Sequence, residues 1–178
     1  MQGVTKFGQL LGVSRDGTAA YSNGQGAFVS TQSNYQHELL TGLKWQCVEY
    51  ARRWFYNNHK LIFDDVDFAF DIWYQINSFY NPATLAKVAT KNYSCPNQVA
   101  PEVGDLLVYN KGYLGTGHVA IIDSVDLDKG LITVIEANYE NTLWPSNFSR
   151  AIPLDLHNDG FGLNEPYLLG WKRVASGS

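Results

Sequence analysis

Apolar residues at helical spacing first gather around residue 50. The segment "KWQCVEYARRW" (residues 44–54) and the phenylalanine after it carry a stripe with three- and four-residue spacing, formed by Val48, Ala51, Trp54 and Phe55. Such a stripe predicts a helix with one buried face. Thr41 and Gly42 offer helix-start chemistry ahead of this segment. The pattern therefore predicts that Cys47 lies at the second or third position of a helix.

Two further helices are predicted between residues 65 and 90. The first runs from about 65 to 79, where Asp64 and Asp65 suit a helix N-terminus. Its apolar stripe consists of Ala69, Ile72, Trp73, Ile76 and Phe79. The segment "PATLAKVAT" (residues 82–90) favours a short third helix with Pro82 near its first turn.

The pattern changes to strands after residue 100. The predicted strands are the end of "PEVGDLLVYN", then "GHVAIIDSV", "GLITVIEAN" and "YLLGWKRV", with "DLDKG" as the turn between the second and the third. Asp-Gly and Asn-Gly pairs in residues 14–28 favour tight turns and short strands near the N-terminus. Helices first and an antiparallel sheet afterwards predict an α+β fold.

Length, charge and cysteine content narrow the class of protein. A chain of 178 residues predicts a single domain spanning 1–178. A net charge of −4 gives no reason to expect nucleic acid as a partner, and no apolar stretch approaches the ~18 residues of a membrane span. The opening segment lacks the pattern of a signal peptide. Two cysteines do not make a disulfide framework, so we expect a reducing, cytoplasmic setting.

Most catalytic motifs are excluded by inspection. No C-x-x-C or H-E-x-x-H pair is present and the four histidines are far apart, so we expect no metal site. The glycine-rich segments lack the residues that complete a phosphate loop, and no G-x-S-x-G serine motif occurs. The chemistry that survives is a cysteine nucleophile, which needs a base to take its proton and a third group to orient that base.

Cys47, His118 and Glu136 meet this requirement in the predicted topology. A thiol near a helix N-terminus meets a positive dipole that stabilises a thiolate. His118 begins one strand and Glu136 ends the next, so a hairpin across "DLDKG" makes them cross-strand neighbours. Plainer interpretations stay open: a core cysteine, a hydrogen-bonded structural histidine and a solvated strand charge. Cys95, in a loop with no helix start, is expected to be inert.

Several motifs, in matching order, resemble one known family. "KWQCVEYARRW", "PEVGDLLVY", "GHVAII", "VIEAN" and "LLGWK", preceded by "FGQLLGVSRDGTAAYSNG", are similar to motifs of the CHAP amidohydrolase domain of the glutathionylspermidine synthetase/amidase and trypanothione synthetase family. The resemblance covers nearly the whole chain. It implies a papain-like α+β fold of the CHAP and NlpC/P60 type, with N-terminal helices packed on an antiparallel sheet.

The resemblance also implies an activity and roles for five residues. The activity is hydrolysis of the amide that joins the glycine of glutathione to spermidine, without metal or cofactor. By motif position, Cys47 would be the nucleophile, His118 the general base and then acid, and Glu136 the residue that holds the imidazole. Arg52 matches an arginine associated with the substrate site, and Asn138, in the family's E-x-N pattern, would assist the site.

Two other functions stay open. The 178 residues hold nothing that corresponds to the ATP-dependent ligase of the bifunctional enzymes. The same scaffold serves peptidoglycan-cleaving CHAP and NlpC/P60 enzymes, so a cell-wall amidase or endopeptidase is the second hypothesis. A non-catalytic domain that binds conjugates or a protein partner is the third. We expect a glutathione–polyamine conjugate as the partner, with no nucleic acid, membrane or obligatory protein partner.

Overall fold

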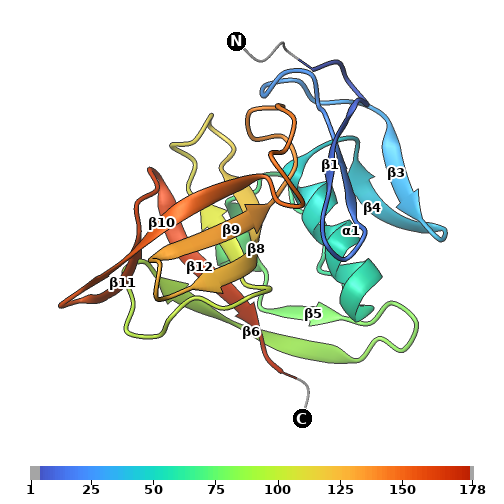
Figure 1. Ribbon diagram of the computed structural model, residues 1–178. Coiled ribbons are helices and arrows are strands. Elements are labelled where there is room, and N and C mark those ends of the chain that lie inside the picture. The colour runs from blue at the N-terminus through green and yellow to red at the C-terminus, as the bar shows by residue number, and fades with distance from the viewer. Residues whose placement is uncertain (1–4, 177–178) are drawn as a thin grey trace.

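An eight-stranded antiparallel sheet dominates the computed structural model, with strands in the order β11-β10-β9-β8-β7-β12-β6-β5 (Figure 1). The structure describes residues 5–176; residues 1–4, on which the expectation of no signal peptide partly rests, and residues 177–178 lie outside this range. Two-stranded sheets β1-β2 and β3-β4 precede the large sheet in sequence. The elements are β1 (Leu10–Val13), β2 (Ala19–Tyr21), β3 (Ser33–Gln36), β4 (Leu39–Leu43), α1 (Cys47–His59), α2 (Asp71–Gln75), β5 (Ser78–Tyr80), β6 (Lys87–Ser94), β7 (Leu106–Tyr109), β8 (His118–Asp126), β9 (Leu131–Ile135), β10 (Arg150–His157), β11 (Gly160–Leu163) and β12 (Leu168–Val174).

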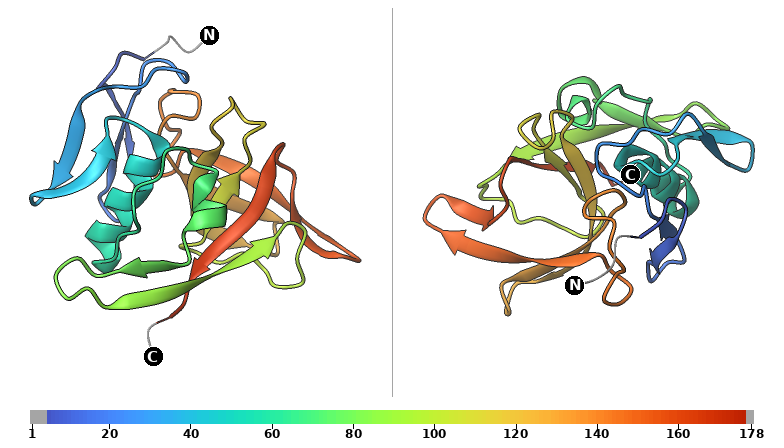
Figure 2. Two further views of the ribbon diagram at one scale, coloured as in Figure 1. Left: turned by 180° about the vertical axis from the view of Figure 1, so that it is seen from behind. Right: turned by 90° about the horizontal axis from the view of Figure 1, so that it is seen from above.

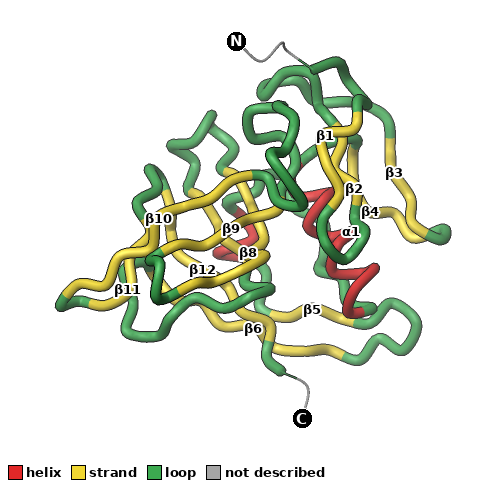
Figure 3. The backbone as a smooth tube through the Cα atoms, in the orientation of Figure 1, coloured by secondary structure: helices red, strands yellow, loops and turns green. Residues whose placement is uncertain are grey.

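The large sheet is strongly curled, and α1 lies beside it (Figures 1 and 2). The two N-terminal hairpins cover the side of α1 that faces away from the sheet, so the helix is enclosed on both sides; its contacts include β4 and β8. Figure 3 shows that strands and loops make up most of the chain and that α1 is its main helical segment. Neither helix within residues 5–176 has the length and apolar character needed to cross a membrane.

Each face of the large sheet carries an apolar core. All four residues of β7 are buried. Because side chains alternate along a strand, Leu106 and Val108 join the cluster that includes α1, whereas Leu107 and Tyr109 join a second cluster on the opposite face. Burial on both faces accounts for the uninterrupted apolar run "LLVY".

The strands predicted after residue 100 are confirmed. They correspond to β7, β8, β9 and β12, with "DLDKG" contributing to the turn between β8 and β9. The first predicted helix is confirmed as α1, but it begins at Cys47 itself. Thr41 and Gly42, expected to start this helix, lie in β4 instead, and the residue before the helix is Gln46. Cys47 is therefore the first residue of the helix, nearer to its N-terminus than the pattern indicated.

The helices predicted over residues 65–79 and 82–90 are wrong in extent and kind. Within the first range α2 covers five residues and β5 follows, and the second range becomes a turn followed by β6. β6 pairs with both β12 and β5, so tertiary pairing decides its conformation rather than local helix propensity. The mixed architecture with an antiparallel sheet is confirmed, whereas the expected layer of several helices is not found within residues 5–176. The papain-like assignment stays a prediction.

Gly170 allows β12 to lie between β7 and β6. The register of β12 against β7 shifts between Leu168 and Gly170, and Gly170 has a φ of 152°. A Cβ at this position would collide with the carbonyl oxygen of Tyr93 on the neighbouring strand and lie 2.9 Å from the backbone nitrogen of Cys95. The irregularity in β12 thus requires a residue without a side chain.

We expect Gly170→Ala to destabilise the protein by more than about 2 kcal/mol, because backbone strain and a collision with a neighbouring strand add together. Gly104→Ala is the matched control, since Gly104 has a φ of 90° but no atom beyond its two neighbours in the chain lies within 4 Å of the place that its Cβ would take. The measurement is the free energy of unfolding in urea. Equal losses for the two variants would contradict the steric role of Gly170.

Candidate active site

The first turn of α1 presents Cys47 together with free backbone donors. Gln46 is the N-cap residue in extended conformation, and its side chain makes no capping hydrogen bond to the helix. The N–H groups at a helix start lack partners within the helix, so this end carries partial positive charge. Cys47 is 8% exposed and is the first residue of the helix. Its thiol therefore lies where a negative charge is stabilised.

Buried polar contacts anchor this helix. Glu49 is 1% exposed and accepts hydrogen bonds from Asn34, Thr41 and Arg53 at 2.8–2.9 Å. Arg52 donates to the carbonyl oxygen of Phe63 at 2.9 Å and to that of Thr41 at 2.6 Å. Because buried charges are costly unless they are paired, these contacts hold α1 in one position against β4.

His118 and Glu136 meet where two neighbouring strands of the large sheet end. His118 is the first residue of β8, and Glu136 follows the last residue of β9, one position after the pair Ile121–Ile135. The His118 Nε2 atom lies 2.7 Å from Glu136 Oε2, and both side chains are 1% exposed. This bond leaves Nδ1 as the imidazole nitrogen available to another group. The expected proximity of the two residues is confirmed.

Glu136 has partners on both carboxylate oxygens. Ser149 donates to Oε1 at 3.0 Å, and Arg150 donates through Nε to the same oxygen at 2.6 Å. Arg150 also bonds Glu165 and the hydroxyl of Tyr109 at 2.8 and 2.9 Å. The carboxylate is therefore fully satisfied despite its burial, which rules out the interpretation of Glu136 as a solvated strand charge.

The charges in this cluster shift the pKa values of both partners. Burial opposes protonation of His118, but its interactions with Cys47 and Glu136 outweigh burial and raise its pKa above the usual value. Burial likewise opposes ionisation of Glu136, yet Arg150 and His118 hold the pKa of its carboxyl well below its usual range. The structure therefore favours an imidazolium beside a carboxylate at neutral pH.

Three tyrosine rings surround the imidazole. The ring centroids of Tyr109, Tyr113 and Tyr139 lie 5.4–5.5 Å from that of His118. Tyr139 also packs under the guanidinium of Arg150, 3.8 Å from ring centroid to Cζ. Aromatic faces favour a nearby cation. The rings fix the orientation of the imidazole and exclude water from it.

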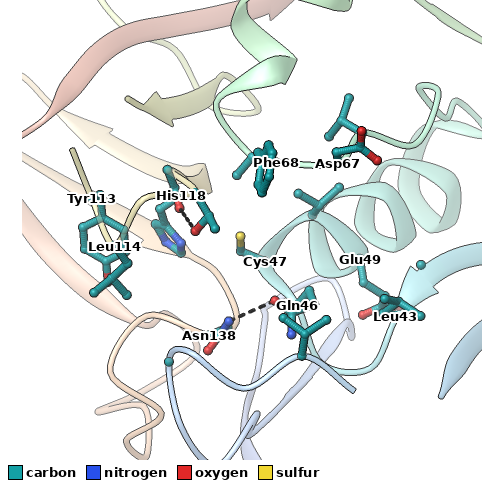
Figure 4. A pocket seen from close by; sticks show the side chains of 18 of the residues that line it. Leu43, Gln46, Cys47, Glu49, Asp67, Phe68, Tyr113, Leu114, His118 and Asn138 are labelled. Carbon is teal, nitrogen blue, oxygen red and sulfur yellow. Dashed lines mark hydrogen bonds between the residues drawn. The ribbon is translucent and has the colours of Figure 1, made fainter. Parts of the chain in front are cut away.

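A cavity of about 270 Å³ lies against Cys47, His118 and Asn138. Figure 4 shows the Cys47 sulfur between His118 and the first turn of α1, with Asn138 bonded to Gln46 beside it. The rest of the lining combines apolar residues with carboxylates and includes Val29, Leu43, Asp65, Asp67, Phe68, Tyr113 and Leu114. A small substrate in this cavity would contact the thiol and the imidazole together.

Four of the five residues predicted from the sequence gather here, and one does not. Cys47, His118 and Asn138 line the cavity, and Glu136 lies behind His118. Arg52 is outside the lining, because its guanidinium is bound to the backbone carbonyls described above and lies 4.0 Å from Asp65. Its position supports a wall of the cavity rather than contact with substrate.

Cys95 lies apart from this cavity. It follows β6, and its sulfur accepts a hydrogen bond from the backbone N–H of Leu163 at 3.4 Å. Burial raises the pKa of its thiol, which disfavours the nucleophilic thiolate. Both cysteines are free thiols. Within residues 5–176, no cluster of three or more histidine, cysteine or acidic side chains is arranged to hold a metal ion.

Comparison with known proteins identifies the family. Residues 39–138 match the CHAP domain, and this range includes Cys47, His118, Glu136 and Asn138. This chain belongs to the CHAP domain family. The expected family resemblance is thereby confirmed.

Curated relatives match this chain over most of its length. It is 31% identical over 182 residues to the bifunctional glutathionylspermidine synthetase/amidase of Escherichia coli, covering 93% of this chain and 29% of the relative. It is 30% identical over 159 residues to the trypanothione synthetase of Crithidia fasciculata, covering 89% of this chain and 24% of that protein. The chain thus spans 24–29% of the length of these relatives.

The sequence analysis of this CHAP chain missed Ser149 and Arg150, which complete the environment of Glu136. Arg150 is the first residue of β10, a strand that was not predicted, and Ser149 directly precedes it. A signal was present, because Ile152, Leu154 and Leu156 alternate with other residues as in a half-buried strand. Recognising that strand would have placed a cation beside β9, with which β10 pairs.

We expect Glu136→Gln to destabilise the protein by about 3–5 kcal/mol at pH 7, because the buried His118 loses the carboxylate that balances its charge and Arg150 keeps only Glu165 as an acidic partner. The folded-state pKa of Glu136 lies below its unfolded value. Its contribution to stability is therefore present above the unfolded pKa and is lost as pH falls below about 4. The difference from wild type should shrink in acid. The measurement is the free energy of unfolding in urea across this pH range.

Glu140→Gln is the control, because Glu140 is an exposed carboxylate on the loop after Glu136. This variant should remain within about 0.5 kcal/mol of wild type. A Glu136→Gln deficit that is small, or that persists unchanged below about pH 4, would contradict the proposed ion pairing.

Proposed function

We propose that this chain is a cysteine amidohydrolase that cleaves the glycyl–polyamine amide of glutathionylspermidine or a closely related conjugate. The observation that carries the proposal is the position of Cys47 at the start of α1, facing a buried His118 that Glu136 holds at 2.7 Å (Figure 4). A nucleophile, a base and a group that orients the base are the components of covalent amide hydrolysis.

In the first half of the proposed reaction, the Cys47 thiolate attacks the glycyl carbonyl carbon and forms a C–S bond. The carbonyl oxygen becomes an oxyanion, which backbone N–H groups at the start of α1 stabilise. The His118 imidazolium donates its proton to the amide nitrogen. The C–N bond then breaks, spermidine leaves and a glutathionyl thioester remains on Cys47.

In the second half, neutral His118 accepts a proton from water, and the resulting hydroxide attacks the thioester carbonyl. The C–S bond breaks, glutathione leaves as the carboxylic acid and loses its carboxyl proton to solvent, and Cys47 returns to the thiolate beside protonated His118. Glu136 stays ionised throughout, because its contacts with Arg150 and Ser149 persist through both steps. Its proposed role is to hold the imidazole and stabilise its positive form.

The lining of the cavity supports a cationic leaving group. Asp65 and Asp67 offer carboxylates to an ammonium group, and Phe68 and Leu114 offer apolar surface to methylene segments. A polyamine consists of these two kinds of group in alternation. The relatives carry the names bifunctional glutathionylspermidine synthetase/amidase, glutathionylspermidine synthase and trypanothione synthetase. Together these observations support the proposed substrate.

We expect Cys47→Ala to abolish release of glutathione and spermidine from glutathionylspermidine while the protein stays folded, because the substitution removes only the nucleophile. The measurement is product formation by chromatography, with the melting temperature as the test of folding. Cys95→Ala is the matched control and should retain turnover. Wild-type protein should also react with iodoacetamide near pH 7 faster at Cys47 than at Cys95.

Two results would redirect the proposal. Clearing of purified peptidoglycan, with no action on glutathionylspermidine, would favour the cell-wall hypothesis. Equal alkylation of the two cysteines together with no turnover would favour a non-catalytic binding domain. A large fall in melting temperature for Cys47→Ala would indicate that Cys47 serves as a packing residue.

We expect Asp67→Asn to raise KM for glutathionylspermidine about 2- to 5-fold with little change in kcat, because an exposed ion pair contributes up to about 1 kcal/mol to binding. Asp64→Asn is the matched control, because Asp64 is exposed but outside the cavity lining. A glutathione alkylamide without a positive charge should be hydrolysed by wild type and Asp67→Asn with the same KM. An equal rise in KM for the neutral amide would contradict the ammonium contact.

A further inference from the structure

Four amide residues form a closed circuit of hydrogen bonds beside the cavity. Gln46 Nε2 donates to Asn23 Oδ1, Asn138 Nδ2 donates to Gln46 Oε1, and Asn141 Nδ2 donates to Asn138 Oδ1, each at 3.2 Å. The backbone N–H of Asn23 closes the circuit by donating to Asn141 Oδ1 at 2.8 Å. We call Asn23, Gln46, Asn138 and Asn141 the amide ring.

The amide ring joins three distant parts of the chain in a protected setting. Asn23 follows β2, Gln46 precedes α1, and Asn138 and Asn141 lie between β9 and β10. Asn23, Asn138 and Asn141 are 1%, 8% and 5% exposed. Buried polar groups need partners, so each of these side chains is held in place by the others.

The backbone fixes the direction in which the ring runs. The Asn23 N–H can only donate, so the Asn141 oxygen must face it and the Asn141 nitrogen must face Asn138. At the other end, Asn23 Nδ2 donates to the carbonyl oxygens of Gln25 and Phe28 at 2.8 and 2.6 Å, which keeps its oxygen toward Gln46. A flip of any one amide would place two oxygens or two nitrogens together.

This direction determines what Asn138 offers to the cavity. The nitrogen of Gln46 already has two acceptors, Asn23 Oδ1 and the carbonyl oxygen of Phe28 at 3.0 Å. The nitrogen of Asn138 has a single acceptor within the described residues, so one of its two N–H groups is left over. Asn138 lines the cavity together with Cys47 and His118 (Figure 4).

We propose that Asn23 and Asn141 are positioning residues that lock the amide of Asn138 with its nitrogen toward the cavity. This inference rests on the proposed amidase function. Neither residue lines the cavity beside Cys47. They act through Asn138 and Gln46, and Asn23 also holds the segment of residues 25–28, which contributes Gly26 and Ala27 to the cavity wall. Misplacement of a polar group by a small distance is enough to slow a reaction strongly.

Asn141→Asp tests the proposal, because it replaces the donor nitrogen by an oxygen and leaves the size unchanged. At about pH 8 the ionised carboxylate faces Asn138 Oδ1 and favours a flipped Asn138. We expect kcat for glutathionylspermidine to fall about tenfold or more, with KM within about twofold of wild type. Asn92→Asp is the matched control, because Asn92 is exposed and donates to the carbonyl oxygen of Trp73 far from the ring.

The pH profile separates positioning from a merely structural role. A protonated carboxyl at position 141 has a donor O–H and an acceptor oxygen, which reproduces the pattern of the asparagine. Burial raises the pKa of such a carboxyl, so protonation should occur within the working range of the enzyme. The ratio of kcat for Asn141→Asp to that of wild type should therefore rise as pH falls from about 8 to about 5.5. Division by the wild-type kcat at the same pH removes the part of the pH dependence that the two proteins have in common.

Unchanged kcat for Asn141→Asp at every pH would overturn the proposal even if the amidase function stands. A loss of kcat that does not recover in acid and accompanies a lower melting temperature would also overturn it. If wild type shows no amidase activity, the proposal is tested by NMR instead. The quantity measured is the rate at which the side-chain N–H protons of Asn138 and Gln46 exchange with water. Exchange about tenfold faster in Asn141→Asp than in wild type and Asn92→Asp supports the locking of these amides, and equal exchange overturns it.

Discussion

A buried carboxylate controls the arrangement of this site. Glu136 is 1% exposed, and a carboxylate in such a place is tolerated only if cations and donors surround it. In the curled sheet, the start of β8 and the residues around the start of β10 lie at the end of β9. These segments provide the partners of the carboxylate, which are His118, Ser149 and Arg150. The same geometry that stabilises Glu136 aims the remaining nitrogen of His118 at Cys47.

Buried charges also fix the position of α1, on the other side of the cavity. α1 buries Glu49, Arg52 and Arg53, and each of these charges is bound by neighbouring backbone or side chains. A helix fixed in this way cannot rotate or slide without breaking buried contacts. Its first residue, Cys47, is therefore held beside His118 by buried contacts that the rest of the helix makes. The amide ring adds a third fixed element at the helix start.

The local sequence pattern was sufficient to predict the centre of the site but not the residues that surround it. The helix stripe around Ala51 and the apolar strand beginning at His118 are strong periodic signals, and they placed Cys47 and His118 on the right elements. Residues 82–90 carry good helix formers, yet much of the segment becomes β6 because two flanking strands pair with it. Arg150 and the amide ring depend on contacts between distant segments, which no local pattern records.

The most direct test of the account is the covalent intermediate. Protein mixed with glutathionylspermidine and quenched within milliseconds should carry a glutathionyl group in thioester linkage, detected as an increase in intact mass and mapped by peptide analysis to Cys47. The group should be absent from Cys95. Release of glutathione and spermidine with no acyl group on Cys47 at any time, or with the group on another residue, would contradict the role of Cys47 as the nucleophile.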